Sequence, residues 1–401
     1  METNNRSLFV LFIAVFIDLF GFGIIIPILP FFADSFGANG FQYGLIISVY
    51  SLMQFIFSPL WGNLSDKVGR RPVILIGLGG SAIGFSIFGI AKNLFMIYLA
   101  RSIAGIFTSA TIPTSYAYIS DTTSEKDRGR GFGLIIAAFG LGFALGPAVG
   151  GLLADHTILG ISGYILPSFL AASLSILNLF SAYFLLPESL NNEDRNLRLK
   201  SKVDLSILSL LDRNKYPGVL LLIIIFAFTS LAFSNYITAF ALYAPEKDIT
   251  VREKQLGWYY TYTGTILFLS QTILINPLLK RFSEEFLVKV GLFLCFLGFI
   301  LLPVAPSFYW MFLTNTPIML GIALINPLIT SLISKKSPRT EQGSIMGKKH
   351  SSAAFMRIIG PLLGGMLFDI NIIYPFYFAS IIFISIFPIA FYFLKVPTKN
   401  D

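Results

Sequence analysis

The chain has 401 residues, of which 55% are hydrophobic and only 12% are charged, and its formal net charge is +8. Soluble domains carry about 25% charged residues, so the composition excludes an ordinary water-soluble protein and predicts an integral membrane protein. The single cysteine excludes an intrachain disulfide, and the two histidines, His156 and His350, are too few for a Cys/His metal cluster. We therefore expect no cofactor and no metal.

Apolar runs along the chain predict twelve membrane-spanning helices, because about 20 apolar residues are needed to cross roughly 30 Å of hydrocarbon. The predicted spans cover residues 8–32, 42–62, 73–91, 95–119, 130–153, 163–186, 218–243, 256–279, 286–303, 307–333, 342–367 and 373–394. The longest polar stretch, residues 187–216, predicts a cytoplasmic linker with a short amphipathic helix near residues 203–211. The predicted fold is all-α, with an N-terminal six-helix bundle over residues 1–186 and a C-terminal six-helix bundle over residues 217–401.

The distribution of lysine and arginine predicts the orientation in the membrane. With the N-terminus in the cytoplasm, the outer loops hold only Lys92, Lys247, Arg252 and Lys254 out of 29 basic residues. Loops rich in Lys and Arg stay on the cytoplasmic side, so we expect both termini there and a plasma or inner membrane as the location. The positive charge then reflects these loops rather than a nucleic-acid partner. We expect a monomer in the lipid bilayer.

An internal repeat with a constant offset of 214 residues supports the two-bundle prediction. The segments "GPAVGGLLAD" (Gly146–Asp155) and "GPLLGGMLFD" (Gly360–Asp369) agree at every glycine, at the proline and at the terminal aspartate. Pro113 matches Pro327 at the same offset. Two similar six-helix bundles that face each other place a cavity at their interface, near the bilayer midplane.

The segment "WGNLSDKVGRRP" (Trp61–Pro72) concentrates charge between the second and third predicted spans. We expect a cytoplasmic turn in which Asp66 lies near the N-terminus of a neighbouring helix and Arg70 pairs with Asp121. Contacts of about 1–3 kcal/mol each would close the cytoplasmic side in one conformation and break in another. A positive-inside stop signal is the alternative for Lys67 and Arg71. The predicted conformational latch consists of Gly62, Asp66, Gly69, Arg70, Arg71 and Asp121.

Three charged residues lie deep in predicted spans, namely Asp18, Arg101 and Arg357. Such charges are costly in a membrane and are functional candidates by default. Asp18 is the predicted proton site, with a hydrogen bond to a neighbouring helix as the alternative role. Arg101 is expected to hold Asp18 ionised or to bond the backbone of the first span. Arg357 is expected to meet an anionic group of a substrate or to balance Asp18, and snorkelling toward the cytoplasm is its alternative.

Other polar and aromatic side chains are predicted to face the cavity, although most aromatic residues of a chain with 41 Phe and 17 Tyr pack against lipid or in the core. The predicted substrate cavity comprises Tyr50, Gln54, Asn235, Tyr259, Tyr262, Gln271, Asn326 and Arg357. The segment "GSIMGKK" (Gly343–Lys349) lacks the glycine spacing and the Ser/Thr of a phosphate loop. No nucleophile–His–acid set can be assembled either, so we do not expect an enzyme.

Four motifs carry a resemblance to a known family. "GNLSDKVGRRP" resembles the signature G-x-L-x-D-[RK]-x-G-[RK]-[RK] of the major facilitator superfamily, and "RSIAGI", with Arg101 and Gly105, resembles its helix 4 arginine motif. "GFGIIIPILP" (Gly21–Pro30) resembles the helix 1 motif of its twelve-helix drug/proton antiporters. "GLGFALGPAVGG" (Gly140–Gly151) resembles the helix 5 antiporter motif, whose residues here are Gly142, Gly146, Pro147, Gly150 and Gly151.

The first half is most similar to tetracycline/proton antiporters, whereas the second half carries only the repeat and a degenerate counterpart of the signature, "KRFSEEF" (Lys280–Phe286). The tetracycline carriers have an acidic residue in the third span where this chain has Gly84, so tetracycline is not expected as a substrate.

The resemblance implies a major facilitator fold and an alternating-access exporter driven by the proton gradient. By position it assigns the latch to Asp66 with Arg70, proton movement to Arg101, and the direction of transport to Gly146 with Pro147. The predicted function is proton-coupled export of a small, amphiphilic, drug-like solute. Two alternatives stay open: an uncoupled or proton-symporting carrier of a sugar-like or anionic solute, and a membrane sensor that does not transport.

Overall fold

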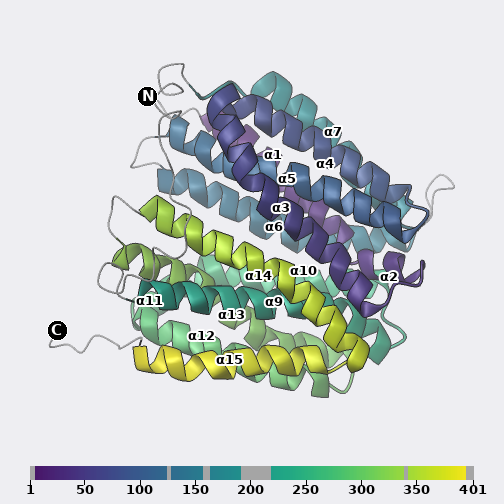
Figure 1. Ribbon diagram of the computed structural model, residues 1–401, viewed down its shortest axis with the longest axis vertical. Helices are drawn as coiled ribbons and strands as arrows, with labels where there is room; N and C mark the ends of the chain where they lie inside the picture. Colours follow the sequence, from purple (N-terminus) through teal and green to yellow (C-terminus); the bar gives the residue numbers. More distant parts are fainter. Residues whose placement is uncertain (1–4, 124–127, 157–162, 191–217, 338–341, 394–401) are drawn as a thin grey trace. The chain divides into compact units, whose positions relative to one another are not determined.

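The computed structural model describes residues 5–123, 128–156, 163–190, 218–337 and 342–393 (Figure 1). Twelve helices in these ranges are long and apolar enough to cross a membrane. The all-α prediction with twelve spans is therefore confirmed for the described residues. Residues 191–216 of the predicted linker lie outside them, and so does the amphipathic helix predicted near residues 203–211.

The eighth and ninth spans are each made of more than one helical segment. In chain order the elements are α1 (Asn5–Ile25), α2 (Leu29–Asp34), α3 (Gly40–Val68), α4 (Arg70–Gly89), α5 (Leu94–Thr122), α6 (Arg128–Ala154), α7 (Ile165–Leu185), α9 (Val219–Lys247), α10 (Glu253–Leu269), the π-helical turn η2 (Ser270–Leu274), α11 (Ile275–Leu279), α12 (Glu284–Leu301), the 3₁₀ turn η3 (Leu302–Val304), α13 (Phe308–Lys336), α14 (Gln342–Ile370) and α15 (Tyr374–Phe393). The eighth span consists of α10, η2 and α11, and the ninth of α12 and η3.

Two predicted spans differ clearly from the structure, and the other boundaries agree to within a few residues. The first predicted span, 8–32, is interrupted: α1 ends at Ile25, and α2 begins after a turn that contains Pro27. Proline lacks a backbone N–H and disfavours helical geometry in the residue before it, which favours the end of α1 before Pro27. The second span continues to Val68 through most of the signature segment, and the expected turn shrinks to Gly69, whose φ of +113° favours glycine.

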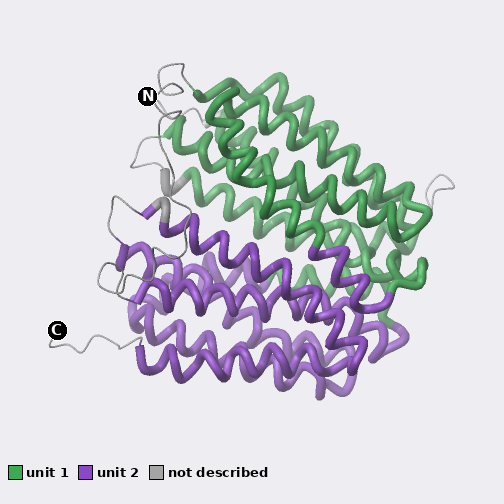
Figure 2. Tube along the Cα trace, viewed as in Figure 1, with its two compact units in different colours: residues 1–38, 49–202, 251–265 green, residues 39–48, 203–250, 266–401 purple. Residues whose placement is uncertain are grey.

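The chain divides into two compact units (Figure 2). Unit 1 comprises Met1–Ala38, Val49–Lys202 and Val251–Thr265, and unit 2 comprises Asn39–Ser48, Val203–Thr250 and Ile266–Asp401. Two helices are shared, because α3 begins in unit 2 and continues in unit 1, whereas α10 begins in unit 1 and continues toward unit 2. The predicted division at residues 187–216 does not include this exchange of helix ends, so the two-bundle assignment stays a prediction.

Helix pairing follows the internal repeat within each unit. In unit 1, α4 packs against α5 and α7, and α1 packs against α6 and α7. In unit 2, α12 packs against α13 and α15, and α9 packs against α14 and α15. The repeated sequence therefore corresponds to a repeated set of helix contacts.

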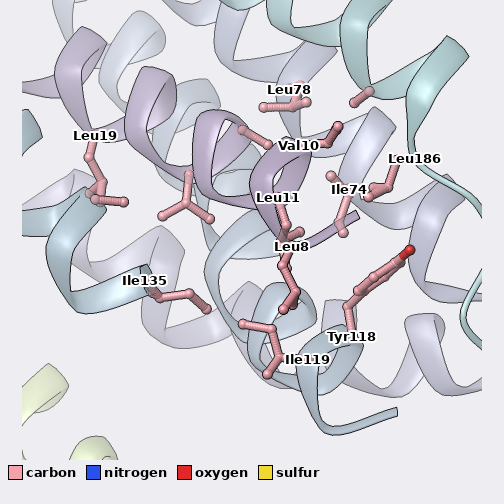
Figure 3. Close-up of a cluster of buried hydrophobic side chains, with 14 residues drawn as sticks. Leu8, Val10, Leu11, Leu19, Ile74, Leu78, Tyr118, Ile119, Ile135 and Leu186 are labelled. Carbon is pink, nitrogen blue, oxygen red and sulfur yellow. The ribbon is translucent and has the colours of Figure 1, made fainter. Parts of the chain in front are cut away.

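Buried apolar side chains pack α1 against α4, α5, α6 and the end of α7 (Figure 3). The cluster consists of Leu8, Val10, Leu11, Ala14, Val15 and Leu19 from α1, Ile74 and Leu78 from α4, Tyr118 and Ile119 from α5, Ile135 and Ala138 from α6, and Ala182 with Leu186 at the end of α7. Lipid tails are as apolar as these side chains, so the helices associate through close van der Waals packing rather than by excluding water. The packing fixes the position of α1, which carries Asp18.

Candidate transport site

Asp18 lies on α1 with its side chain buried against α4. The residue is only 3% exposed, and its Oδ1 accepts a hydrogen bond from Ser81 Oγ at 2.9 Å. The helix-to-helix hydrogen bond expected as the alternative role of Asp18 is therefore present. Ser81 was not singled out from the sequence, because a lone serine in a helix usually bonds its own backbone and gives no distinctive pattern.

Gly84 lies one turn after Ser81, at the position where the resembled tetracycline carriers have an acid. A Cβ atom at Gly84 would lie 3.1 Å from both the backbone nitrogen and the Cβ of Ala104 on α5. A side chain at this position would require α5 to move by a few tenths of an ångström. The departure from the tetracycline carriers is thus accompanied by tight helix packing.

Arg101 of α5 is buried among aromatic and polar side chains of unit 1. Its Cζ lies 4.2 Å from the ring centroid of Tyr50 and 5.3 Å from that of Phe22, which are cation–π distances. The Tyr50 hydroxyl is 3.1 Å from Thr108 Oγ1, and Gln54 Nε2 donates to the Tyr50 hydroxyl at 3.1 Å. Arg101, expected near Asp18, therefore lies with two residues of the predicted substrate cavity, Tyr50 and Gln54.

Arg70 connects three helices at the predicted latch. Its side chain is 2% exposed, and Nε donates to Asp121 Oδ2 at 3.0 Å. Nη1 donates to Ser65 Oγ and Nη2 to Asp66 Oδ1, both at 2.6 Å. The pairing expected between Arg70 and Asp121 is present, and it ties the end of α5 to the start of α4 and the end of α3.

The carboxylate at the N-terminus of α4 belongs to Glu188, whereas Asp66, expected at a helix N-terminus, binds the Arg70 side chain. Glu188 Oε1 accepts a hydrogen bond from the Arg70 backbone N–H at 2.8 Å, and Oε2 accepts one from the Arg71 N–H at 3.1 Å. A carboxylate at this place satisfies donors that have no partner within the helix. Glu188 was missed because it is 118 residues from Arg70 and belongs to the predicted linker.

The other latch residues have different surroundings. The Arg71 guanidinium donates to the Tyr183 carbonyl oxygen and lies 5.2 Å from the Tyr183 ring centroid, so it contacts α7. Gly69 provides the break between α3 and α4. A Cβ at Gly62 would meet nothing within 4 Å, so packing does not require glycine there.

The glycines of the helix 5 motif bring α6 into backbone contact with two helices. A Cβ at Gly142 would lie 2.9 Å from Leu19 Cβ, and one at Gly146 would lie 2.7 Å from the Phe20 carbonyl oxygen, both on α1. Gly150 also faces α1, at the Ile24 carbonyl. Gly151 and the Pro147 carbonyl oxygen face α10, whereas the Pro147 ring lies close to Gly23 of α1. The glycines of this motif therefore give α6 a small-residue surface toward α1 and α10.

The predicted cavity residues are spread over both units. Tyr50, Gln54, Tyr259 and Tyr262 belong to unit 1, and Asn235, Gln271, Asn326 and Arg357 belong to unit 2. Asn235 and Tyr259 are fully buried, and Asn235 Nδ2 donates to the Pro375 carbonyl at 2.8 Å, a contact between α9 and α15. Gln271 lies in the π-helical turn η2. That all eight residues line one cavity stays a prediction.

The cations of α14 differ in their surroundings. Arg357 is exposed, whereas Lys349 is buried: its Nζ donates to Thr330 Oγ1 at 2.5 Å and lies 4.1 Å from the Phe226 ring centroid. The His350 ring lies edge-on to the same Phe226 ring. Lys349 was not among the predicted buried charges because it is close to the end of its span. Among the described residues, no group of three or more His, Cys, Asp and Glu side chains is placed to hold a metal ion.

The chain is similar to known drug-resistance proteins along almost its whole length. Multidrug resistance protein 2 of Bacillus subtilis is 27% identical over 386 residues, which cover 95% of this chain and 94% of that protein. The quinolone resistance protein NorA of Staphylococcus aureus is 27% identical over 377 residues, which cover 94% of this chain and 93% of that protein.

Solved transporter structures share the fold. A bacterial homologue of the human lysosomal transporter Spinster, in an inward-facing and occupied conformation, has a TM-score of 0.76 at 13% identity and covers 98% of this chain and 96% of its own. A POT family transporter in complex with a thioalcohol-conjugated peptide has a TM-score of 0.79 at 17% identity and covers 97% of this chain and 96% of its own. The sequence model of the Major Facilitator Superfamily matches residues 11–347 and 222–401. The chain therefore belongs to the Major Facilitator Superfamily and is a multi-pass membrane transporter.

Proposed function

We propose that this transporter exports small, amphiphilic, drug-like solutes across the plasma membrane in exchange for protons, by alternating access. The names of its relatives support the solute class, since they describe resistance to multiple drugs and to quinolones. The helix 1 and helix 5 motifs, which resemble those of the antiporter branch, support the direction. Both termini would lie in the cytoplasm.

The observation that carries the proposal is the position of Asp18. Every other Asp or Glu within the described spans lies close to an end of its helix, whereas Asp18 lies well inside α1. It is buried, and its hydrogen bond comes from a neutral hydroxyl, that of Ser81. Carboxyl groups inside membrane-spanning segments commonly serve as proton relays. Asp18 would therefore take up a proton in one state of the carrier and release it in the other.

Arg101 would respond to the same cycle through α3. Its guanidinium stacks on Tyr50 of α3, and Gln54 holds the Tyr50 hydroxyl from the next turn of that helix. Because α3 has residues in both units, a change of this contact would reach both. Arg101 thus has a coupling role in the proposal, and Tyr50 with Gln54 has a role toward the solute.

Transport by the purified protein in proteoliposomes tests the proposal. A fluorescent quinolone and an amphiphilic cationic dye serve as probes, and uphill movement is measured with and without an imposed pH gradient. Asp18→Asn is expected to reduce gradient-driven transport at least about tenfold while exchange of labelled for unlabelled probe continues. Ser81→Ala is the matched control: it removes the hydrogen bond but keeps the carboxyl group, so gradient-driven transport is expected to persist.

Two results would contradict the proposal. Uphill transport with unchanged pH dependence in Asp18→Asn would show that Asp18 is not the coupling group. Movement of both probes by the unaltered protein at a rate independent of the pH gradient would indicate an uncoupled carrier.

A further inference from the structure

The first turn of α3 is held by a carboxylate from α14. Asp369 Oδ1 accepts a hydrogen bond from the Gly40 N–H at 2.7 Å, and Oδ2 accepts one from the Phe41 N–H at 2.8 Å. The next donor is capped locally, since Asn39 Oδ1 accepts from the Gln42 N–H at 2.8 Å. The first N–H groups of a helix have no partners within it and form its positive end, so a carboxylate is favoured there.

Glycine allows the backbones of α3 and α14 to touch at the same place. A Cβ on Gly365 would overlap the Gly40 carbonyl oxygen, and a Cβ on Gly44 would overlap the Pro361 carbonyl oxygen. One turn further along α3, the Ser48 hydroxyl donates to the Ile358 carbonyl at 2.6 Å. All these residues belong to unit 2.

In unit 1, α6 and α10 make the same kind of backbone contact that α14 and α3 make in unit 2. A Cβ on Gly151 would overlap the Glu253 carbonyl oxygen, and a Cβ on Gly257 would lie 2.5 Å from the Pro147 carbonyl oxygen. Gly151 and Pro147 are the repeat counterparts of Gly365 and Pro361. The repeated glycine–proline segment therefore packs against the first turn of α10 in unit 1 and against the first turn of α3 in unit 2.

The terminal aspartates of the two repeated segments differ in what they bind. Asp155 Oδ2 is 3.9 Å from Lys254 Nζ, and each of the two side chains is about half exposed. The first residue of α3 is Gly40, whereas the first residue of α10 is Glu253. Glu253 accepts a hydrogen bond from the Tyr164 hydroxyl at 3.0 Å. A second carboxylate at this helix start would repel Asp155. Asp369 alone caps the backbone directly.

We propose that Asp369 is a positioning residue for alternating access, which holds the outer end of α3 against α14 and releases it when the carrier opens outward. The proposal rests on the alternating-access part of the proposed function, not on proton coupling. Phe41 and Asp369 are both exposed, so water can replace the lost hydrogen bonds when the contact opens. The glycine surfaces leave no interlocked side chains to separate. The contact is therefore easy to break and to re-form.

Labelling of Ser48→Cys with a membrane-impermeant maleimide from the outer face tests this role, in a background with Cys295→Ser. Ser48 is 2% exposed in this structure, so it reports on separation of α3 from α14. Asp369→Ala is expected to raise the labelling rate about tenfold, which corresponds to about 1.4 kcal/mol. Asp369→Asn keeps an acceptor oxygen without the charge and should give a smaller rise. Asp155→Ala is the matched control, with an expected change below about twofold.

A pair of glycine variants on α14 provides a second test. Gly365→Ala places a methyl group against the Gly40 carbonyl and should also raise labelling of Ser48→Cys. A Cβ at Gly347 would meet nothing within 4 Å, so Gly347→Ala should leave it unchanged. An unchanged rate in Asp369→Ala would overturn the proposal, whether or not Gly365→Ala has an effect. Labelling of Ser48→Cys only from the inner face would overturn the assignment to the outer end.

These measurements need neither a transported solute nor a proton gradient. Loss of the export proposal would leave the labelling result intact, and an unchanged labelling rate would leave the transport result intact. The two proposals can therefore fail separately.

Discussion

The internal repeat relates the turn between α3 and α4 in unit 1 to the turn between α11 and α12 in unit 2. An ion pair forms at each turn, but the basic and acidic members have exchanged places. Arg70 pairs with Asp121 at 3.0 Å, and Glu284 pairs with Lys335 at 2.9 Å. Arg70 corresponds to Glu284 and Asp121 corresponds to Lys335, each at the offset of 214 residues. The repeat therefore preserves the place of an ion pair between two helices but not the residue types that make it.

The two pairs differ in burial and in additional partners. Arg70 and Asp121 are 2% and 5% exposed, whereas Glu284 and Lys335 are 14% and 65% exposed. Arg70 also binds Ser65 and Asp66, while Glu284 has one further bond, from Ser331. Exposed ion pairs contribute about 0–1 kcal/mol, whereas removing one member of a buried pair costs about 3–5 kcal/mol. The difference predicts that the latch function resides in unit 1.

Truncating one member of each pair should have the largest effect, and only in unit 1. Arg70→Ala leaves Asp121 and Ser65 buried without this partner, so we expect a loss of about 3–5 kcal/mol in the free energy of unfolding. The matched variant in unit 2, Glu284→Ala, should cost about 0–1 kcal/mol. Denaturant unfolding in detergent micelles measures both. Equal losses would contradict the assignment of the latch to unit 1.

Exchanging the acidic and basic members of a pair tests whether stability requires only an ion pair at that position or also its original orientation. In unit 2, Glu284→Lys with Lys335→Glu should retain stability within about 1 kcal/mol. In unit 1, Arg70→Glu with Asp121→Lys should remain destabilised by about 3 kcal/mol, because Asp66 would face a second carboxylate. Unfolding and probe transport are measured together for both double variants. Full recovery of the unit 1 reversal would mean that Asp66 is not part of the arrangement.

The cap on α4 should contribute less than the buried pair. Glu188→Ala removes the acceptor of the Arg70 and Arg71 backbone N–H groups, and we expect a loss of about 1 kcal/mol. Glu188→Gln keeps an acceptor oxygen and should lose less. Unfolding measurements on the two variants check this order, and a larger loss in Glu188→Gln would contradict it.

Salt should have the smallest effect and should distinguish the two pairs. At about 1 M salt the Debye length falls to about 3 Å, which screens exposed charges far more than buried ones. The stability difference between the unaltered protein and Glu284→Ala should shrink by a few tenths of a kcal/mol at high salt. The difference for Arg70→Ala should hardly change. A strong salt dependence for Arg70→Ala would contradict the burial of its pair.

The sequence by itself determined the membrane-spanning architecture. Within a bilayer every backbone polar group must be satisfied internally, so an apolar run of sufficient length becomes helical, and the twelve predicted runs correspond to twelve candidate spans in the described residues. It also indicated the Arg70–Asp121 pair, because both residues lie at helix ends on the same expected side of the membrane. The four motifs placed the chain in its family.

Only the tertiary structure decided which helix faces meet. In lipid all outward faces are apolar, so hydropathy does not indicate how a helix is rotated toward its neighbours. The pairing of Asp18 with Ser81, the cap from Glu188 and the burial of Lys349 depend on that rotation. The sequence showed that Asp155 and Asp369 are repeated. Their partners differ because Asp369 meets a helix that begins with Gly40, whereas Asp155 meets one that begins with Glu253.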